Sequence, residues 1–279
     1  MNAKLELFKI YKTVCDNQNI TKAAQELFVS QSAVSQAIKQ LEQQAGVTLL
    51  NRNKQGVTMT AEGKVLFSYV SSAVNLLQTA QNKLEDMKTL AMGTLKIAAS
   101  DTISQYLLLK KLEQYSKQYP AIKLQIVNRT SKESIELLKL GKVDIAFVNM
   151  PIFDDEITVT KYFKIHDIFV VPKGSEYLKK TYTLEEISKL PLILLEEKSN
   201  SRFCVQEHFL NNGITIRPEI ELGSHELLLL FAKINLGVSC VIKEFSTQYF
   251  DSLSPLKIEK SQELPARYIG IAYLKGVSL

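Results

Sequence analysis

The stretch FVSQSAVSQAIKQLE, residues 28–42, decides the fold of the N-terminal part of this 279-residue chain. Its apolar side chains recur at helical spacing and predict one buried stripe, made of Val34, Ala37, Ile38 and Leu41. The opposite side carries short hydroxyls and amides with a single lysine: Ser32, Ser35, Gln36, Lys39 and Gln43. A helix side that only faces water is usually rich in Glu and Lys, so this composition needs another explanation.

The residues that precede this helix predict a helix-turn-helix. A first amphipathic helix is indicated by Leu5, Phe8, Ile10, Tyr11 and Val14. Thr21 is the predicted N-cap of a second helix over residues 22–28, and Ser30 is that of the third, over residues 31 to about 44. Because only Val29 and Ser30 lie between the second and third helices, the two form a tightly joined pair.

A short ribbon follows the third helix. Gly46 is expected to end that helix, and LLNRNKQGVTMT, residues 49–60, comes next. Gly56 is placed in a turn, with Arg52 and Lys54 near its tip. This pattern predicts a wing, a two-stranded ribbon with a basic end.

The polar helix side suits a helix that enters the major groove of DNA. Gln pairs with adenine, Ser serves either base type, and Lys or Arg suits guanine or phosphate, whereas carboxylates would be repelled by the backbone. A solvated face of low charge is the alternative for the helix alone. The tight turn and the basic wing favour DNA reading.

Residues 61–92 predict one long linker helix. Thr60 is its candidate N-cap, and Glu62 suits the positive end of the helix dipole. Apolar residues alternate by four and three along it: Leu66, Val70, Ala73, Leu77, Ala80, Leu84 and Met87. Such a seam favours dimerisation, and packing against the chain's own domain is the alternative. Gly93 breaks the pattern as a hinge.

The remaining residues, 93–279, change to an α/β rhythm. Short β-rich runs recur: TLKIAAS, IKLQIVN, VDIAFVN, DIFVVP, LPLILLE, RPEIEL, VSCVI and RYIGIAYL. Helical stretches such as SQYLLLKKLEQYSKQY and SKESIELLKLGK lie between many of them, which predicts mixed or parallel sheets. The segment is long enough for two lobes, with crossovers expected at 159–163 and 259–264.

Composition excludes several classes of protein. The net charge of +5 is too mild to establish a nucleic-acid partner by itself. The cysteines, Cys15, Cys204 and Cys240, show no metal-ligand or CxxC spacing, which predicts reduced thiols in a cytoplasmic protein. No signal peptide is visible, and the most apolar run, LLLLFA, is too short to cross a bilayer. None of the three histidines lies in a catalytic or metal-binding motif, so we expect no enzyme, no metal and no cofactor.

The run NITKAAQELFVSQSAVSQAIKQLEQQAGVTLLNRNKQGVTMTAEGKVL, residues 19–66, resembles the N-terminal domain of the LysR-type transcriptional regulators. Ser32 stands where that family often has Pro, and Leu50 where it usually has Phe. Neither departure threatens the fold, because Ser suits a helix start and Leu keeps an apolar contact. The family usually continues into a further helix after the strand that ends near Leu274, so we expect different C-terminal packing and assembly contacts.

The resemblance implies an α+β multi-domain chain. It would contain a winged helix-turn-helix (1–60), a linker helix (61–92) and a two-lobed effector domain (93–279) similar to periplasmic solute-binding proteins. Lobe I would comprise about 93–160 and 265–279, and lobe II about 161–264. Dimers or dimers of dimers would bind AT-rich inverted repeats of double-stranded DNA near promoters, with RNA polymerase as a further partner. The implied DNA contacts are Thr21, Gln31, Ser32, Ser35, Gln36, Lys39, Arg52 and Lys54. A cytosolic solute-binding protein, the other alternative, would not need residues 1–60.

A small, anionic effector is the expected ligand of the C-terminal part. Ligands of two-lobed α/β domains bind at the carboxyl ends of strands, where helix N-termini favour anions. Polar residues follow four predicted strands: Ser100, Thr102, Thr130, Ser131, Ser199, Ser201, Arg202, Ser224 and His225. Each alone is also explained as a helix cap, an ion-pair partner or a packing residue. A domain that serves only assembly or protein contacts, and a redox role for Cys204, are the alternatives.

Overall fold

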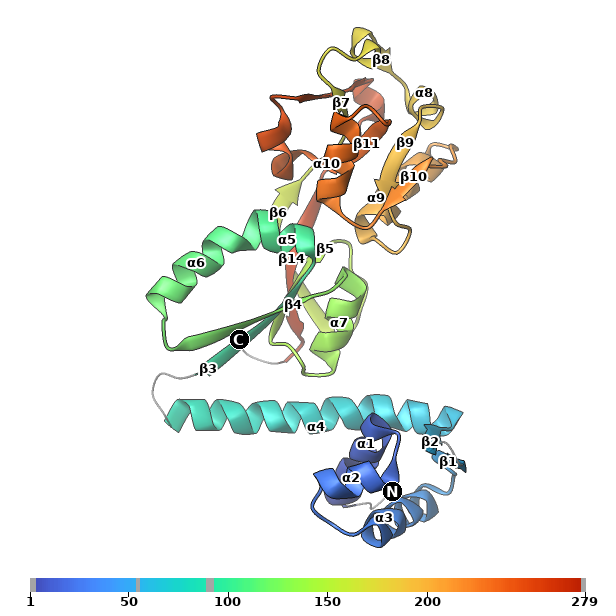
Figure 1. Cartoon of the computed structure of the whole chain (residues 1–279), viewed down its shortest axis with the longest axis vertical. Helices are drawn as coiled ribbons and strands as arrows, with labels where there is room; N and C mark the ends of the chain where they lie inside the picture. Colours follow the sequence, from blue (N-terminus) through green and yellow to red (C-terminus); the bar gives the residue numbers. More distant parts are fainter. Residues whose placement is uncertain (1–3, 54–55, 89–92, 277–279) are drawn as a thin grey trace. The chain divides into compact units, whose positions relative to one another are not determined.

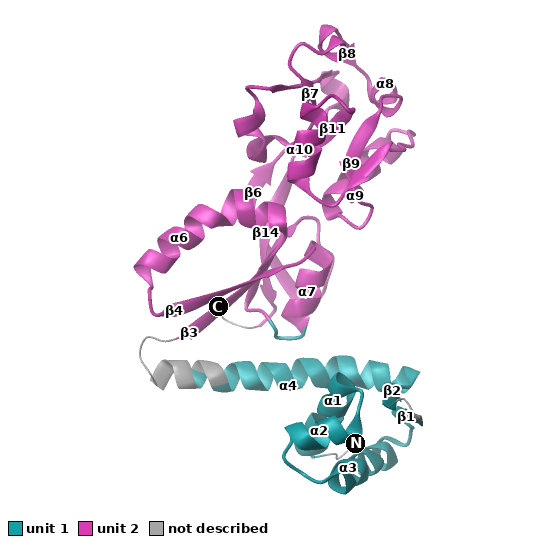
Figure 2. Ribbon diagram, in the orientation of Figure 1, with its two compact units in different colours: residues 1–91, 140–142 teal, residues 92–139, 143–279 magenta. Residues whose placement is uncertain are grey.

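The computed structural model describes residues 4–53, 56–88 and 93–276; the side chains of residues 53, 82, 83 and 85–88 are not part of that description. The chain forms two compact units (Figures 1 and 2). The first comprises residues 1–91 with 140–142, and the second comprises residues 92–139 with 143–279. Each unit has its own hydrophobic clusters and is described by itself.

The first unit is a helical core with a β-ribbon. Its elements are α1 (Leu5–Asn17), α2 (Ile20–Glu26), α3 (Gln31–Ala45), β1 (Leu50–Asn53), β2 (Gly56–Met59) and α4 (Ala61–Lys88). The buried face of α3 is the predicted stripe of Val34, Ala37, Ile38 and Leu41. It joins one cluster with Tyr11 of α1. Ala23 and Ala24 are the buried residues of α2, and their small side chains let the three helices approach closely.

Local chemistry sets the ends of these helices. The N-cap of α2 is Asn19, whose side chain accepts a hydrogen bond from Lys22 N at 3.0 Å. The prediction that Thr21 caps this helix is wrong, because Thr21 already lies within its first turn. Ser30 caps α3 as predicted by accepting from Ala33 N at 3.2 Å. Gly46 ends α3 with a φ of 71°, a left-handed conformation that suits glycine.

The ribbon and α4 are anchored to that core. Strands β1 and β2 pair antiparallel, from Leu50 opposite Met59 to Asn53 opposite Gly56. Thr60 caps α4 as predicted, since its Oγ1 accepts a hydrogen bond from Gly63 N at 2.9 Å. The buried Tyr11 hydroxyl donates to Gly63 O at 2.8 Å and so ties α1 to the first turn of α4.

The second unit contains two five-stranded mixed sheets. The first, in lobe I, has the order β4-β3-β5-β14-β6. Its strands are β3 (Gly93–Ala99), β4 (Ile122–Asn128), β5 (Ile145–Asn149), β6 (Ile157–Ile165) and β14 (Arg267–Leu274). Strand β3 pairs parallel with β4 and β5, while β14 runs antiparallel to β5 and β6. The connecting helices are α5 (Asp101–Ile103), the π-helical segment η1 (Ser104–Leu108), α6 (Leu109–Gln118) and α7 (Ser131–Lys139).

Lobe II repeats this arrangement, with the strand order β10-β9-β11-β7-β12. Its strands are β7 (Asp167–Pro172), β9 (Leu192–Leu195), β10 (Ile220–Leu222), β11 (Val238–Ile242) and β12 (Leu253–Pro255). Its α-helices are α8 (Leu184–Ser188), α9 (Asn200–Asn211) and α10 (His225–Lys233). Smaller elements complete it: the pair β8 (Thr181–Tyr182) and β13 (Lys257–Ile258), and the 3₁₀ turns η2 (Glu176–Lys179), η3 (Lys243–Phe245), η4 (Thr247–Tyr249) and η5 (Lys260–Gln262).

The chain passes between the lobes at two places. Strand β6 continues in the first sheet to Ile165, and β7 begins in the second sheet at Asp167. The crossover expected at 159–163 therefore lies inside β6, a strand that the sequence reading missed although ITVTKYFKI alternates apolar and polar residues. The crossover expected at 259–264 lies between β13 and β14.

Candidate DNA-binding face and effector cleft

The polar side of α3 is accessible. Gln31, Ser32, Gln36 and Lys39 are exposed, and Ser35 is half-buried. The hydroxyls of Ser30 and Ser32 lie 2.9 Å apart, so Ser32 also contacts the N-cap. Thr21 on α2 is exposed as well. The residue types on this face include both donors and acceptors of the kind that read base edges.

The wing is held at a fixed position relative to α3. The Glu42 carboxylate near the end of α3 accepts hydrogen bonds from Leu49 N at 2.8 Å and Leu50 N at 3.1 Å, where the ribbon begins. On the other strand, Val57 N donates to Gln18 O at 3.0 Å. Arg52 on β1 is exposed, and Lys54 lies outside the described residues.

The predicted seam of α4 divides into two parts. Val70 is buried in the core of its own unit, and Leu66 packs against that core. Val70 is therefore a wrong prediction for a contact with a second chain, because its side chain is only 6% exposed within that core. Leu77 and Leu84 are 47% and 60% exposed, and Ala73 and Ala80 are exposed too. The side chain of Met87 is outside the description.

Further apolar side chains of α4 are exposed beside this seam. Val65, Tyr69 and Leu76 are 62%, 73% and 37% exposed. The first two line an apolar groove of about 340 Å³ whose other walls include Val47 and Leu49. Exposed apolar side chains thus run along α4 from Val65 to Leu84.

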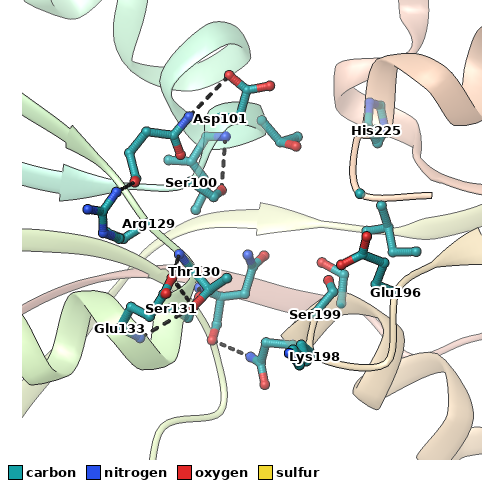
Figure 3. Close-up of a pocket in the computed structure, with 18 of the residues that line it drawn as sticks. Ser100, Asp101, Arg129, Thr130, Ser131, Glu133, Glu196, Lys198, Ser199 and His225 are labelled. Atoms are coloured by element: carbon teal, nitrogen blue, oxygen red, sulfur yellow. Dashed lines mark hydrogen bonds between the residues drawn. The ribbon is translucent and has the colours of Figure 1, made fainter. Parts of the chain in front are cut away.

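A cavity of about 450 Å³ lies where the two lobes meet in the second unit (Figure 3). Six strand ends contribute to its walls. Parallel strands of lobe I bring Ser100, Asn128 and Asn149, and parallel strands of lobe II bring Leu195, Leu222 and Ile242. The first residues of α5, α7, α9 and α10 also line it. Their free N–H groups and positive dipole ends favour an anion.

The structure brings most of the predicted effector residues together. Those that line this cavity are Ser100, Thr102, Thr130, Ser131, Ser199, Ser201 and His225. Arg202 does not line it and borders a smaller cavity instead. Ser224 occupies the N-cap position of α10 without a side-chain cap bond and is not among the lining residues.

Several of these hydroxyls already have structural partners. Thr130 Oγ1 donates to the Glu133 carboxylate at 2.8 Å at the start of α7. Ser131 Oγ accepts from Asn149 N at 2.9 Å, and Ser100 Oγ accepts from Ile103 N at 3.4 Å. The capping interpretation therefore accounts for part of the polar pattern at the strand ends.

Five charged side chains of the cavity were not identified from the sequence: Asp101, Arg129, Glu133, Glu196 and Lys198. Hydrogen bonds from the Thr130 backbone and side chain hold the pKa of Glu133 below its ordinary value. Three acidic and two basic groups give this rim no excess of positive charge. An attraction for anions must come from the helix N-termini. The signal that could have found the five residues is adjacency in the sequence, since each lies within three positions of a predicted polar residue.

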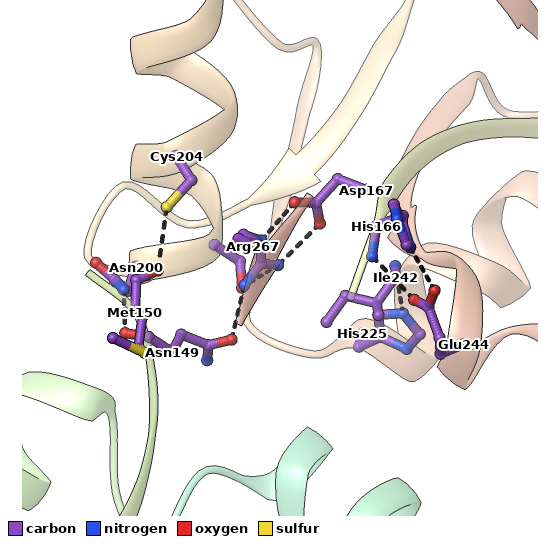
Figure 4. Close-up of polar contacts among 11 residues, drawn as sticks. Asn149, Met150, His166, Asp167, Asn200, Cys204, His225, Ile242, Glu244 and Arg267 are labelled. Atoms are coloured by element: carbon purple, nitrogen blue, oxygen red, sulfur yellow. Dashed lines mark hydrogen bonds and ion pairs between the residues drawn. The ribbon is translucent and has the colours of Figure 1, made fainter. Parts of the chain in front are cut away.

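A buried ion pair joins the lobes behind the cavity (Figure 4). Arg267, at the start of β14, donates from Nε and Nη2 to the two carboxylate oxygens of Asp167 at 2.5 and 2.8 Å. It also donates to Asn149 Oδ1 at 2.7 Å and to Ser201 Oγ at 3.0 Å. The proximity of Asp167 raises the pKa of Arg267 despite its burial. Beside this pair, Asn200 Nδ2 donates to Asn149 O at 2.5 Å.

A second contact between the lobes centres on Glu226. Its carboxylate accepts hydrogen bonds from the Tyr106 hydroxyl at 2.5 Å and Gln105 Nε2 at 3.2 Å, both from η1 in lobe I. The Tyr249 hydroxyl of lobe II donates to the other oxygen. The Tyr106 ring stacks on Phe245 with centroids 5.4 Å apart. Hydrogen bonds from Tyr106 and Tyr249 lower the pKa of Glu226.

Cys204 lacks the environment of a reactive thiol. Burial raises its pKa, and its Sγ lies 3.8 Å from Met150 O. Because the thiolate is the reactive form, these surroundings favour a structural role. Among the residues that the structure describes, no cluster of His, Cys, Asp or Glu could hold a metal ion. Within the same residues, no helix has both the length and the apolar character needed to span a membrane.

Two family models match the chain in the places where these sites lie. Residues 5–64 match "Bacterial regulatory helix-turn-helix protein, lysR family", and residues 88–279 match "LysR substrate binding domain". A winged helix-turn-helix followed in the chain by a two-lobed α/β domain is the domain composition of a DNA-binding transcriptional regulator. The chain belongs to the LysR family of transcriptional regulators, a family of regulators and not of enzymes.

Known proteins agree with this assignment. HTH-type transcriptional activator CmpR of Synechocystis sp. is 29% identical over 241 residues, covering 85% of this chain and 78% of that protein. The RuBisCO operon transcriptional regulator of Allochromatium vinosum is 25% identical over 243 residues, covering 86% and 80%.

The solved structures show the same fold at low sequence identity. A full-length OxyR variant from Pseudomonas aeruginosa has a TM-score of 0.72 at 20% identity, over 98% of this chain and 90% of that one. Full-length CbnR, solved with its target DNA, has a TM-score of 0.65 at 19% identity, over 99% and 94%. The Synechocystis CcmR regulatory domain, solved in complex with 2-PG, has a TM-score of 0.61 at 19% identity, over 67% and 90%.

Proposed function

We propose that this regulator works in the cytoplasm, reads its operator with α3 and the wing, and changes its DNA complex when a small anion enters the cavity between the lobes. The functional parts are the DNA-binding domain (1–60), the linker helix (61–92) and the effector domain (93–279). The observation that carries the effector role is the convergence of six strand ends and four helix N-termini on one cavity.

Residue type supports the assigned DNA contacts, and accessibility supports those that the structure describes. Gln31, Ser32, Ser35 and Gln36 contact bases, and the residues that hold phosphates or the minor groove are Thr21, Lys39, Arg52 and Lys54. Phosphate contacts dominate the affinity, and groove contacts supply the selectivity. Because Glu42 fixes the start of the wing to α3, both elements meet the duplex as one rigid surface.

Fluorescence anisotropy tests this assignment. Full-length protein is titrated with a duplex from immediately upstream of its own gene and with a scrambled duplex, over a salt series. We expect a preference for the native duplex that survives rising salt, and Ser35→Trp should abolish that preference while the protein stays folded. The matched control, Thr247→Trp, places the same bulk on an exposed site of the C-terminal part. A preference for the native duplex that Ser35→Trp retains at the wild-type level would contradict the assigned reading face.

The partner of the exposed apolar side of α4 is a second copy of this chain. Leu77 and Leu84 supply apolar contacts that a lone helix would leave in water. The same helix exposes Val65 and Tyr69, which extends the contact toward the wing. Leu77→Glu is expected to give monomers in analytical ultracentrifugation, whereas the exposed control Gln81→Glu should leave the dimer intact. An unchanged dimer in Leu77→Glu would refute this role of α4.

The effector role has its own assay. The first compound to test is 2-PG, with small carboxylates and phosphates as a panel, in DNase footprinting on the native duplex. An effector that fits one lobe arrangement better shifts the balance between two assemblies and so changes the footprint. A footprint that no member of the panel alters would favour the alternative, in which the C-terminal domain serves assembly alone.

A further inference from the structure

A second, smaller cavity lies behind the effector cavity in lobe II. Its volume is about 20 Å³, which admits one water-sized group. Its polar walls are Asp167, Ser201, Arg202 and His225. The two cavities share Ser201 and His225. A ligand in the larger cavity therefore has a neighbouring space that fits one of its atoms.

Two buried side chains offer unused donors at this place. Arg202 and His225 are each only 3% exposed. Among the residues that the structure describes, none accepts a hydrogen bond from Arg202 Nη1 or pairs with His225 Nδ1. His225 Nε2 accepts from Ile242 N at 3.0 Å, so the ring proton sits on Nδ1 and makes that atom a donor. Burial lowers the pKa of His225 to about 4, so the ring is neutral near pH 7.

The existing partners of Arg202 leave one of its donors without a hydrogen bond. Nε donates to Gln206 Oε1 at 3.3 Å, and Nη1 lies 3.6 Å from Glu221 Oε1, beyond hydrogen-bond distance. Burial lowers the pKa of Arg202, because desolvation outweighs the nearby carboxylates. A buried guanidinium with an open donor is costly unless a further acceptor approaches it.

The other polar walls do not compete for that donor. Asp167 uses both carboxylate oxygens on Arg267, which also cancels its charge. Ser201 Oγ accepts from Arg267 Nη2 and keeps its own proton to donate. The wall thus presents donors from three side chains, so a well-matched occupant is an acceptor. An anionic oxygen meets this condition and can accept a charge-assisted hydrogen bond from Arg202.

We propose that this cavity is an acid-group subsite of the effector site. One oxygen of a carboxylate or phosphate group enters it from the larger cavity and accepts hydrogen bonds from Arg202 Nη1 and His225 Nδ1. This proposal rests on the effector role of the larger cavity and adds the chemical group that the effector must carry. Glu221 forms an ion pair with the same Nη1 and competes with the ligand for it.

Isothermal titration calorimetry of the full chain with inorganic phosphate tests the subsite, in a buffer with no other multivalent anion. Wild type should bind phosphate saturably. Arg202→Met should weaken that binding roughly thirtyfold or more, as expected when one partner of a buried charged hydrogen bond is removed. Glu221→Gln should strengthen it about fivefold, because a competing carboxylate of ion-pair strength is neutralised. The two variants are expected to change the phosphate affinity in opposite directions. Glu221→Gln therefore still tests the subsite if Arg202→Met does not fold.

Three results would overturn the subsite. They are an absence of saturable phosphate binding by the wild type, binding by Arg202→Met within about twofold of wild type, and weaker binding by Glu221→Gln. The first would mean that a buried water serves the two donors, and the third that Arg202 and Glu221 form only a structural pair. Equal binding by Arg202→Met leaves the larger cavity as the effector site. The preference of the same variants for the native duplex should not change. This second measurement distinguishes a failure of the subsite proposal from a failure of the proposed DNA binding.

Discussion

Removing Arg267 should destabilise the second unit strongly, because its partner would remain as a buried, unpaired charge. The side chains of Arg267 and Asp167 are 8% and 6% exposed. The guanidinium donates four hydrogen bonds, two to Asp167 and one each to Asn149 and Ser201. Arg267→Met keeps the apolar length of the side chain and deletes all four donors. Breaking a buried pair in this way costs about 3–5 kcal/mol.

A double-mutant cycle separates the lost pair from lost packing. In Asp167→Asn/Arg267→Met both charges are absent, so the double variant should be less destabilised than the sum of the single variants by at least about 2 kcal/mol. The assay is urea denaturation followed by circular dichroism. Hydrogen exchange of the β7 and β14 amides assigns the change to this unit, since a chain of two compact units need not unfold in one step. A loss below about 1 kcal/mol for Arg267→Met, or additive single losses, would refute the reasoning.

Three further outcomes are expected. Gly63→Ala should cost about 3 kcal/mol in urea denaturation, because its Cβ would lie 2.1 Å from Leu49 O, whereas Lys64→Ala on the exposed side should cost little. The folded-state pKa of His225 is lowered from 6.5 to about 4, so the unfolded state takes up the proton first, and about 3 kcal/mol of stability is lost as pH falls through that interval. His225→Gln should flatten that loss, and an unchanged pH profile would contradict the assignment. Arg52→Ala should weaken binding to every duplex and reduce the salt slope by about one, and an unaltered slope would remove Arg52 from the phosphate contacts.

Local pattern was enough for much of the fold. The buried stripe of α3, its caps Ser30 and Gly46, and the N-cap Thr60 lie where spacing and capping chemistry place them. These features depend on residues a few positions apart, so a short window contains the relevant physics. The N-cap of α2 was misplaced because Asn19 and Thr21 are both good caps, and only the path of the chain before the helix selects between them.

Only part of the effector cavity could be predicted from the sequence, and the reason is different. The sequence placed nine polar residues beside strand ends, and seven of them line the cavity. Which strand ends meet depends on the sheet orders, and those depend on pairing across many residues. Strand β6 was missed because it lies at the edge of its sheet with a half-exposed face, which weakens the apolar signal. Val70 was assigned to a partner because a helical seam does not record which surface covers it.

The sequence by itself determined that the chain is a winged helix-turn-helix followed by a long helix and an α/β segment long enough for two lobes. Periodicity and turn residues carry that information locally. Only the tertiary structure decided that Arg267 pairs with Asp167, 100 residues away, and that Arg202 and His225 border one small cavity. The physical reason is that burial removes water from a polar side chain. The side chain is then either hydrogen-bonded to another protein group or left as an unsatisfied donor. Burial is a property of the packed molecule and not of any short stretch of it.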